Sequence, residues 1–526
     1  MLLPCTLVLS LLLVLHQSNA YKILVYSQKN GRSQVIYMGQ LAEILIDAGH
    51  DVTLLHVEMD PEIKINGTNR AKIVTIPVAP KVRDYFSVDV IADTWTLDVS
   101  NPLAQSEMVH GYAMMMADQC RFTATHYSVF EELKKENFDL LVHELFDHCQ
   151  LGFMQTIGVK NQVALQSTVL LEGVSEIIGV PHIPSIVPSS FSTKGNRMTL
   201  FERIINVVQS EISRSLISTN WQTEEEIYRE KLGDKLVPFQ DIIDQATFII
   251  TNGDPFLDFP HPLVSKVIEL GGICVKKPQP LSKEWNLVLE KQEKAVLISF
   301  GSIAKSFSMP MHFKKAIAET IKSFPKVMFI WKYEKDDTEF LDGIDNVYTS
   351  KWVPQNDVLN HPNLKLFITH GGMNSILEAC HRGVPVIGVP LFGDQMRNVR
   401  MVEALGSGTH FERLNLGNPN ILKATIEKVL FNKSYEESAQ RVAAMIANRP
   451  IDLKHSFVRH VEFAAKFGPV PNMTPISRHM SFFSYFMLDA VLLIGSILLL
   501  VILLVFVVLR RLVTYVFRLG TKQKLS

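Results

Sequence analysis

The chain has 526 residues, more than one domain usually contains, so at least two domains are expected. Lys and Arg number 52 against 53 Asp and Glu, and the net charge of −1 gives no argument for nucleic acid as a partner. The hydropathy of the chain is high for a soluble enzyme, and its two ends explain why.

Residues 1–20 form an apolar stretch that ends in the small-residue pattern Ser18-Asn19-Ala20. This pattern predicts a signal peptide, which is removed from the mature protein and takes no part in the fold.

The mature sequence opens with a strand–helix–strand pattern. Residues 22–27 are an apolar run typical of a strand, and 35–50 carry apolar residues at helical spacing, with Gly49 near the end as a cap. Residues 51–56 predict the next strand. Units of this kind build parallel sheets.

The middle of the first half is less regular. Residues 86–230 contain long helical patterns and a Pro-rich passage at 179–188. His143 and His148 stand five residues apart, which does not place them on one helix face, and the apolar lead-in at 138–142 indicates a strand. We therefore expect local polar structure here and no zinc site.

Strand patterns then recur in the second half, with helical patterns between them. They lie at residues 295–300, 327–331, 364–368 and 386–389. Residues 437–466 also predict helix, with a break near Pro450. No GxGxxG, P-loop or strand-end Asp-x-Asp occurs in the sequence, so a metal-clamped diphosphate is not indicated.

The most informative segment is FITHGGMNSILEACHRGVPVIGVPLFGDQ, which starts at Phe367. A strand, a turn through Gly371 and Gly372 and a helix would point free backbone N–H groups at one spot, which suits an anion such as phosphate. Glycines let the backbone approach that anion closely, and Asn374 and Ser375 can cap the first turn or donate to the anion.

Three further polar residues of this segment fall at positions where ligands bind. Glu378 lies four residues after Asn374, on the same helix face, and offers a carboxylate to hydroxyl groups. Asp394 and Gln395 follow the next strand, at the edge where open α/β sheets bind ligands. A Gly-Gly turn alone would be an ordinary β–α connection, but the combination indicates a nucleotide-sugar pocket.

Near the other end, residues 487–509 run for about 23 residues with only Asp489 charged, long enough to span a bilayer. Basic residues follow, and the positive-inside tendency puts them in the cytosol. The prediction is a single-pass type I membrane protein with its body in the lumen. Lys522 and Lys524 resemble a di-lysine retrieval signal of the endoplasmic reticulum, although contact with anionic lipid is an alternative for the tail.

After cleavage four cysteines remain, Cys120, Cys149, Cys274 and Cys380, too few for a disulfide scaffold and not pairable from sequence. Sequons at Asn66, Asn432 and Asn472 predict a glycoprotein.

The segment from His370 to Gln395 resembles the signature of the UDP-glycosyltransferases, in particular the animal UDP-glucuronosyltransferase group. Trp352-Val-Pro-Gln355 resembles the uridine-contacting segment of that family, and Ser299-Phe-Gly-Ser302 its first donor-side loop. The resemblance extends over nearly the whole chain. It implies a GT-B fold: an α/β protein with two Rossmann-like domains facing a cleft, followed here by a C-terminal transmembrane helix.

The resemblance also implies roles for the donor residues. Trp352 would stack on uracil and Gln355 would bond the nucleoside. Glu378 would accept from the ribose hydroxyls, and Asp394 and Gln395 would read the sugar. The diphosphate would be held by Ser302, His370, Asn374, Ser375 and the backbone of Gly371 and Gly372.

At the catalytic position this chain departs from the family, whose members usually carry a His after a Gly-x-Ser turn. Here Gln34 follows Gly31-Arg32-Ser33, and a Gln amide cannot take a proton at neutral pH. Glu144 matches the carboxylate that would orient the His, with Asp147 as the second candidate.

Three readings stay open. The enzyme transfers to acceptors that need no strong base; or Glu144, His143 or His148 takes the proton; or the chain is a weak family member that binds nucleotide sugar or lipophile, or partners active relatives.

The expected donor is UDP-glucuronate or UDP-glucose, with no cofactor and no metal beyond it. Expected partners are a small lipophilic acceptor, membrane lipid and a homo- or hetero-oligomer with related transferases. The predicted organisation is a signal peptide at 1–20, an acceptor-binding domain at 21–285, a UDP-sugar-binding domain at 286–450, a returning helix and linker at 451–480, a transmembrane helix at 487–509 and a cytosolic basic tail at 510–526.

Overall fold

Strands followed by helices repeat along both halves of the chain and build two parallel sheets. The computed structural model describes residues 20–86, 94–97 and 101–523, so all but the last residue of the predicted signal peptide and part of the basic tail lie outside the described residues. The chain divides into two compact units, Met1–Thr474 and Pro475–Ser526. Both sheets belong to the first unit.

The first sheet has seven strands in the order β3-β2-β1-β4-β5-β6-β7, all parallel. They are β1 (Lys22–Lys29), β2 (Asp51–Glu58), β3 (Lys72–Ile76), β4 (Leu140–Glu144), β5 (Gln162–Gln166), β6 (Phe248–Thr251) and β7 (Val267–Glu269). The central strands β1, β4 and β5 are buried on both faces, as continuous apolar runs in parallel sheets require.

The second sheet has six parallel strands in the order β10-β9-β8-β11-β12-β13. They are β8 (Lys294–Ser299), β9 (Val327–Lys332), β10 (Val347–Ser350), β11 (Leu364–Thr369), β12 (Val386–Gly388) and β13 (Gly408–His410). The strands expected from the sequence are present in both sheets, with ends displaced by a few residues.

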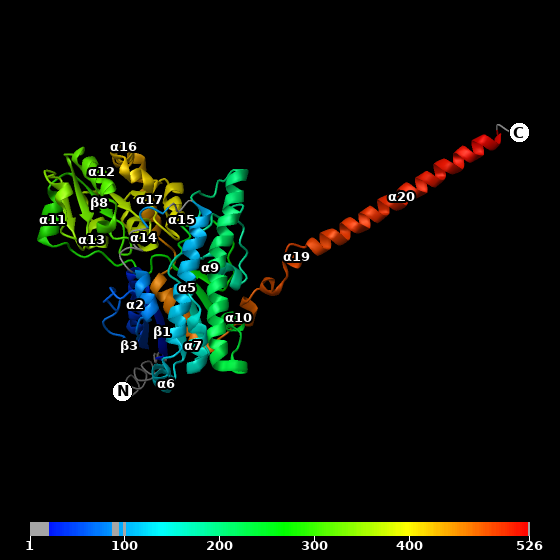
Figure 1. Ribbon diagram of the computed structural model, residues 1–526, viewed down its shortest axis with the longest axis horizontal. Helices are drawn as coiled ribbons and strands as arrows, with labels where there is room; N and C mark the ends of the chain where they lie inside the picture. Colours follow the sequence, from blue (N-terminus) through cyan, green and yellow to red (C-terminus); the bar gives the residue numbers. More distant parts are fainter. Residues whose placement is uncertain (1–19, 87–93, 98–100, 524–526) are drawn as a thin grey trace, which may run out of the picture. The chain divides into compact units, whose positions relative to one another are not determined.

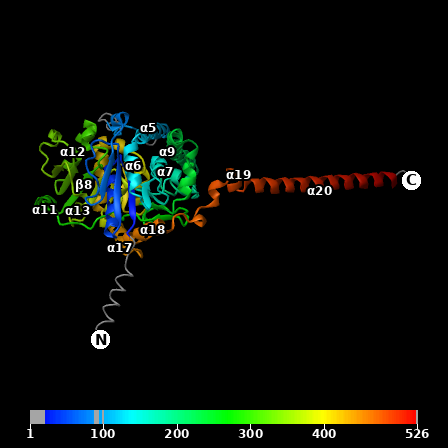
Figure 2. The ribbon, with the colours of Figure 1, turned by 90° about the horizontal axis from the view of Figure 1, so that it is seen from below.

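Helices cover both sheets, and Figures 1 and 2 show α11 to α14 grouped around β8 and α5, α6, α7 and α9 around the first sheet. The first half contains α2 (Arg32–Asp47), α3 (Pro80–Arg83), α5 (Pro102–Thr123), α6 (Tyr127–Lys135), α7 (Cys149–Ile157), α8 (Glu172–Ile177), α9 (Leu200–Leu232) and α10 (Phe239–Asp244). The second contains α11 (Lys283–Glu290), α12 (Met311–Lys322), α13 (Gln355–Leu359), α14 (Met373–Arg382), α15 (Gln395–Ala404), α16 (Pro419–Phe431) and α17 (Lys433–Ala447).

The ends of α14 test a sequence expectation. Gly383 ends the helix in the left-handed conformation, with φ of 66°. The prediction that Asn374 or Ser375 could cap the first turn is wrong, because Gly372 is the N-cap and no side chain caps the helix. Both side chains are therefore free for other partners.

The strand orders place one crossover switch in each sheet. In the first sheet β1 lies between β2 and β4, and in the second β8 lies between β9 and β11. At such a switch the loops after the two neighbouring strands diverge, which leaves a crevice at their carboxyl ends where open α/β sheets bind ligands. Gln34 lies shortly after β1, and Glu144 is the last residue of β4. Ser302 lies after β8, and His370 directly follows β11.

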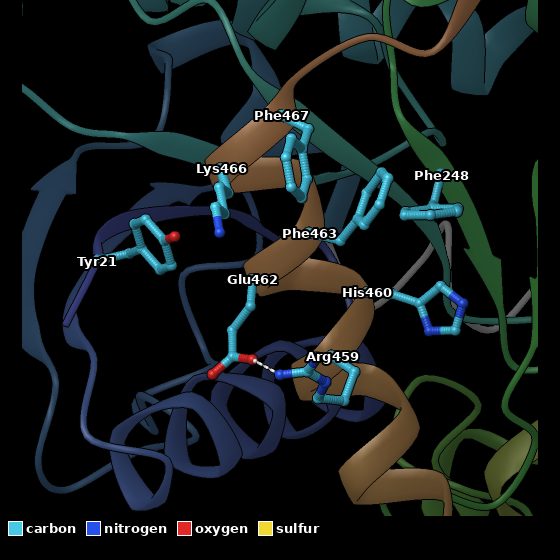
Figure 3. Close-up of a pocket in the computed structure, with 8 residues that line it drawn as sticks. All are labelled: Tyr21, Phe248, Arg459, His460, Glu462, Phe463, Lys466 and Phe467. Atoms are coloured by element: carbon cyan, nitrogen blue, oxygen red, sulfur yellow. Dashed lines mark hydrogen bonds and ion pairs between the residues drawn. The ribbon is translucent and has the colours of Figure 1, made fainter. Parts of the chain in front are cut away.

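A helix from the end of the first unit returns to the first sheet. α18 (Leu453–Phe467) is capped by Asp452, whose side chain accepts from the amide of His455, and it buries Phe457, Val461 and Ala464 in the core of the first half. Beside it lies a groove of about 460 Å³ (Figure 3). Its lining residues are Tyr21, Phe248, Arg459, His460, Glu462, Phe463, Lys466 and Phe467, none of which the sequence assigned to donor binding.

The domain boundary expected between residues 285 and 286 falls inside α11. Trp285 and Leu289 of this helix pack in the core of the second half, together with Val358 and Ile376. By packing, α11 belongs wholly to the second half.

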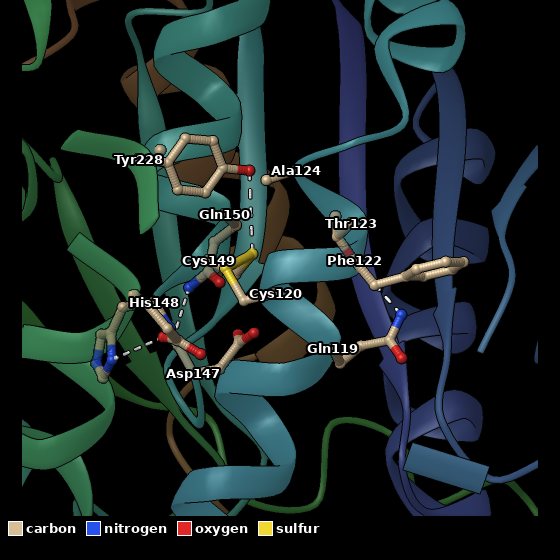
Figure 4. Close-up of a disulfide and its surroundings, with 12 residues drawn as sticks. Gln119, Cys120, Phe122, Thr123, Ala124, Asp147, His148, Cys149, Gln150 and Tyr228 are labelled. Carbon is tan, nitrogen blue, oxygen red and sulfur yellow. Dashed lines mark hydrogen bonds and ion pairs between the residues drawn. A yellow bond between two sulfur atoms is a disulfide. The ribbon is translucent and has the colours of Figure 1, made fainter. Parts of the chain in front are cut away.

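A disulfide joins α5 to the start of α7 through Cys120 and Cys149, a pairing that the sequence could not give (Figure 4). The bond lies against the Tyr228 hydroxyl of α9. Cys274 and Cys380 are free thiols.

The two halves also share core packing. Trp95 comes from the first half but is fully buried in the core of the second, edge-on to Phe300 and with its indole N–H donating to the Ser308 hydroxyl. Next to it, the Arg413 guanidinium donates to the carbonyl oxygen of Thr94 at 2.7 Å. These contacts fix the 94–97 segment on the second half.

The second unit contains α19 (Phe482–Tyr485) and α20 (Leu488–Gln523). Within the described residues, Leu488–Arg518 is the one stretch long and apolar enough to cross a membrane, judged by length and composition. It starts one residue after the predicted start and continues past the predicted end at Leu509.

The burial of Trp95 yields a stability prediction. Trp95→Ala removes a fully buried indole and its hydrogen bond, and a loss of about 3–5 kcal/mol in the free energy of unfolding of the second half is expected. Urea unfolding followed by circular dichroism measures it. Leu287→Ala is the control, because that side chain is 72% exposed on α11, and an equal loss in both variants would contradict the burial argument.

Candidate functional site: a donor pocket facing a carboxylate

The loops after β8 and β11 meet at the switch of the second sheet. Ser299 and Thr369 pair in register at the strand ends, so the turns that follow them lie side by side. A Cβ on Gly301 would lie 2.7 Å from the His370 ring, and one on Gly372 would lie 2.5 Å from it. Glycine is therefore required at both positions, and the structure brings His370 against the loop that carries Ser302.

His370 is neutral in this environment. Burial, with help from the Lys332 charge, lowers its pKa to about 4. Its Nδ1 lies 3.3 Å from the Thr369 hydroxyl, which can donate to it. The tautomer that accepts at Nδ1 carries the proton on Nε2, and that N–H is then a neutral donor beside the glycine turn.

Gln355, Ser375 and Glu378 form one hydrogen-bonded group at the start of α13 and along α14. The Gln355 amide donates to the Ser375 hydroxyl at 3.1 Å and to Oε2 of Glu378 at 2.7 Å. Burial raises the pKa of Glu378, and the bond from Gln355 opposes that shift. The sequence assigned Gln355 and Glu378 to the nucleoside and Ser375 to the diphosphate, and the structure joins the three by hydrogen bonds.

Trp352 presents an open aromatic face, since the residue is 54% exposed. The guanidinium carbon of Arg32, from the N-terminus of α2, lies 4.3 Å from the centre of its ring, a cation–π contact between the two halves. Sequence reasoning missed Arg32, although it stands inside the same Gly31–Gln34 turn as the expected catalytic position.

Asp394 and Gln395 behave differently from each other. The Asp394 carboxylate accepts from the Asn398 amide at 2.7 Å. Gln395 is only 3% exposed, and its Oε1 accepts from the backbone amides of Leu391 and Phe392. Gln395 therefore holds the loop after β12 with its oxygen, and its amide nitrogen is the atom left for a ligand.

On the first half, Gln34 and Glu144 meet as the sequence anticipated. The Gln34 amide lies 3.4 Å from Oε2 of Glu144, while Oε1 accepts from the amide of Ser167 at 2.9 Å. Burial raises the pKa of Glu144 to about 7, against the opposing effect of the bonds from Ser167 and Gln34. A carboxylate with this pKa exchanges a proton near neutral pH.

His143 and His148 do not face this position. His143 is fully buried, with Nδ1 3.1 Å from the Gln150 amide and Nε2 2.7 Å from Oε1 of Gln162, and burial lowers its pKa to about 4. His148 is fully buried against the Trp221 ring, and its pKa is lowered to about 3. Local polar structure, as expected from the sequence, describes both.

Asp147 belongs to a second buried acidic group, near the disulfide (Figure 4). Its carboxylate bonds the Gln28 amide, and burial together with the Glu144 charge raises its pKa well above the usual range. Glu224 of α9 lies in the same interior, bonded to the His148 amide at 2.7 Å, and its pKa is raised by burial and by Asp147. Burial thus raises the pKa of both carboxyls, which disfavours Asp147 as a proton acceptor.

Two side-chain bonds join the halves at the crevice. The Thr168 hydroxyl donates to Oδ2 of Asp394 at 2.6 Å, and the Asn252 amide donates to Oδ1 of Asn374 at 3.1 Å. Thr168 adjoins Ser167, which bonds Glu144. Glu144 is thus linked to Asp394 through two adjacent residues, a relation that no spacing in the sequence revealed.

Comparison with known proteins agrees with this geometry. The family model described as UDP-glucoronosyl and UDP-glucosyl transferase matches residues 21–525. A putative UDP-glucuronosyltransferase of Caenorhabditis briggsae, ugt-47, is 30% identical over 93% of each chain, and its Caenorhabditis elegans counterpart is 29% identical over 92% of each.

A mammalian relative and a solved structure extend the comparison. UDP-glucuronosyltransferase 1A8 of Rattus norvegicus is 29% identical over 76% of this chain and 73% of its own. The crystal structure of the glycotransferase of kitacinnamycin superposes with a TM-score of 0.52 at 17% identity, covering 85% of this chain and 98% of its own, which supports the two-sheet fold.

The site geometry predicts different losses for different substitutions. Trp352→Ala and Glu378→Gln should weaken the binding of UDP, because base–aromatic stacking is worth roughly 1–3 kcal/mol. Asp394→Asn should slow transfer and leave the Kd for UDP nearly unchanged. Titration calorimetry with UDP and a transfer assay measure the two effects.

Trp285→Phe serves as the control for the tryptophan, since Trp285 packs against Tyr348 outside the pocket. Equal losses of UDP affinity at Trp352, Glu378 and Asp394 would contradict the assignment.

Proposed function

Since the chain belongs to the UDP-glucuronosyl and UDP-glucosyl transferase family and is a glycosyltransferase, we propose that it moves a hexose from a UDP-sugar to small lipophilic acceptors with inversion at the anomeric carbon. One observation carries the proposal. The Thr168–Asp394 bond and the neighbouring Ser167–Glu144 bond hold an ionisable carboxylate of the first half beside the proposed sugar-binding residue of the second half.

The second half would bind the donor. Uracil stacks on Trp352, and Glu378, oriented by Gln355, accepts from the ribose hydroxyls. The diphosphate lies at the N-terminus of α14, where the backbone of Gly371 and Gly372 and the neutral Nε2–H of His370 donate to it. These fixed dipoles stabilise the negative charge that grows on the leaving UDP.

Glu144 would take the proton. As the acceptor oxygen bonds to the anomeric carbon from the face opposite UDP, its O–H proton passes to Oε2 of Glu144 and the bond to the diphosphate oxygen breaks. A base with a pKa of about 7 is half ionised at neutral pH, which suits the task.

Gln34 would act as a positioning residue. Its amide donates toward the same carboxylate oxygen at 3.4 Å, which fixes the orientation of Glu144 and favours its ionised form. In this arrangement the carboxylate that usually serves a histidine becomes the base itself. Two classes of acceptor then suit the enzyme better. Phenols and other acidic hydroxyls release their proton more readily, and amines lose theirs only after they have attacked the anomeric carbon.

A second function is favoured by the same Gln34. A chain without an effective base can bind UDP-sugar or lipophile and serve active relatives in a homo- or hetero-oligomer. Binding of UDP without turnover of any acceptor would support it. The choice between UDP-glucuronate and UDP-glucose rests on a panel of donors with one phenolic acceptor.

If Glu144 is the base, transfer to a phenol should rise with pH through about 7 and level off above it, because only the ionised carboxylate accepts a proton. Glu144→Gln should remove this dependence and lower kcat by a factor of about 100 to 10,000. Initial rates from pH 5.5 to 8.5 measure both. A wild-type profile flat across this range would contradict the role of Glu144.

Gln34→His should restore the usual base and raise transfer to alcohols far more than transfer to amines, since an amine attacks through its own lone pair. A new pH dependence near 6.5, the ordinary pKa of His, should accompany the gain. Gln40→His is the matched control, because Gln40 lies on the same helix but lines a separate groove with Glu43 and Arg70. No gain on any acceptor would place the base elsewhere.

We further propose that α20 anchors the protein in the endoplasmic reticulum membrane as a single-pass type I protein with the catalytic body lumenal. The support is the length of the apolar stretch and the basic residues that follow it in the sequence. Protease added outside intact microsomes should trim only residues after Arg510, and glycosidase should reduce the mass of the protected body.

Changing Lys522 and Lys524 to Ser should release the protein from the endoplasmic reticulum, as followed by the processing of its glycans. Retention of the double variant in the endoplasmic reticulum would show that Lys522 and Lys524 are not the retrieval signal.

A further inference from the structure

A group of metal-ligating side chains lies outside the donor site, in the connection between the halves. In the described part of the chain, Asp258, His261 and Glu269 are the one group of three such residues whose ligand atoms all lie within 4.8 Å of one another. Asp258 and His261 belong to the loop after β6, and Glu269 ends the edge strand β7. None of the three takes part in the proposed transfer.

Two of the ligand atoms are buried without a hydrogen-bond partner. They are Oδ2 of Asp258, whose side chain is only 2% exposed, and Nε2 of His261. A buried polar atom without a hydrogen-bond partner is destabilising, so it calls for a ligand. Oε1 of Glu269 lies 3.9 Å from Nε2 of His261, on the side where that nitrogen is free.

The imidazole is also held as a metal-binding imidazole usually is. Nδ1 of His261 lies 2.8 Å from the carbonyl oxygen of Phe259, so Nδ1 carries the proton and Nε2 presents its lone pair. Metal-bound histidines commonly donate their second nitrogen to a carbonyl in this way. The tautomer needed for coordination is therefore set by the backbone of the loop itself.

Asp258 is oriented by its other oxygen. Oδ1 pairs with the Arg397 guanidinium at 2.6 Å and accepts from the Phe259 amide at 2.6 Å, which leaves Oδ2 directed to the group. Arg397 belongs to α15, so this carboxylate connects the group to the second half. Arg397 therefore acts like the hydrogen-bonding neighbours that commonly fix the orientation of a metal-binding carboxylate.

Space for an ion is kept by a glycine. A Cβ on Gly253 would lie 3.1 Å from Oε1 of Glu269 and 3.9 Å from Oδ2 of Asp258. A larger residue would therefore crowd the Glu269 oxygen. The charges nearby also favour a cation: Asp254, Asp258 and Glu269 face Arg397 and Arg449, three carboxylates against two guanidinium groups.

We propose that Asp258, His261 and Glu269 bind a divalent transition-metal ion of the zinc class. One imidazole nitrogen and two carboxylate oxygens are ligands of this ion, and a water would complete the tetrahedron. Ligand atoms around zinc stand about 3.4 Å apart, so the three side chains would close by roughly 1 Å on binding. The ion would tie the connecting loop to β7 and, through Arg397, to α15, a structural role separate from catalysis.

The test uses the full-length protein in detergent, stripped with EDTA and titrated with Zn²⁺. One Zn²⁺ per chain by calorimetry and metal analysis, with a rise in Tm, is expected for the wild type. His261→Ala and Glu269→Gln should each weaken Zn²⁺ binding by at least about tenfold and remove the rise in Tm. Loss of a residue that only hydrogen-bonds a metal ligand already lowers metal affinity about tenfold or more, so loss of the ligand itself should lower it at least as much. His312→Ala, an exposed histidine outside the group, should bind as the wild type does.

His261→Arg separates this proposal from an ion pair. Arginine supplies a permanent positive charge between the two carboxylates but no metal ligand. A folded His261→Arg protein that ignores Zn²⁺, beside a wild type that responds to it, supports the metal site. No response of the wild type to Zn²⁺, or an equal response in any of the three site variants, overturns it.

Discussion

The alignment of two sheet edges is the constraint on which the rest of this structure depends. Each sheet has its crossover switch between two central strands, and both switches open at the carboxyl ends of the strands. The proposed donor site in one sheet can act only if the proposed base of the other is held opposite to it. The Thr168–Asp394 and Asn252–Asn374 bonds do this, because each joins a loop of the first sheet to a residue of the donor segment. The fully buried Trp95 and the returning helix α18 then connect the halves through core packing, which is stronger than two polar bonds alone.

Burial decides the protonation of the groups around the crevice, and it does so differently for each. The pKa values of His143, His148 and His370 are lowered chiefly because burial desolvates the charged imidazole. The pKa values of Asp147 and Glu224 are raised by burial and, in addition, by a neighbouring acid. Glu144 alone is moved to about 7, since bonds from Ser167 and Gln34 offset part of the cost of burial. A buried carboxylate that titrates near neutral pH therefore lies beside Gln34, which makes the proposed reaction without a histidine chemically reasonable.

The connection between the halves is held by ion pairs. Asp254 pairs with Arg449 and Asp258 with Arg397, so both carboxylates of the loop after β6 are held by cations from the second half of the chain. His261 and Glu269 add two further ligand atoms on the side facing the first sheet. The ion pairs, the tautomer of His261 and the missing Cβ of Gly253 all lie in this connecting loop. They concern how the two halves are held together and not the transfer itself.

The sequence by itself determined the strands, the glycine turn, the membrane-length helix and the family, because these depend on local apolar runs, on glycine geometry and on residue spacing. It also identified Gln34 and Glu144 as neighbours, through the resemblance. Only the tertiary structure decided which polar groups meet across the crevice. Arg32 over Trp352, Thr168 at Asp394 and the Cys120–Cys149 bond each join residues far apart in the chain, so no local pattern encodes them. The same holds for Gln395, whose oxygen the fold commits to the backbone, and for the cap of α14, where Gly372 takes the place expected for Asn374.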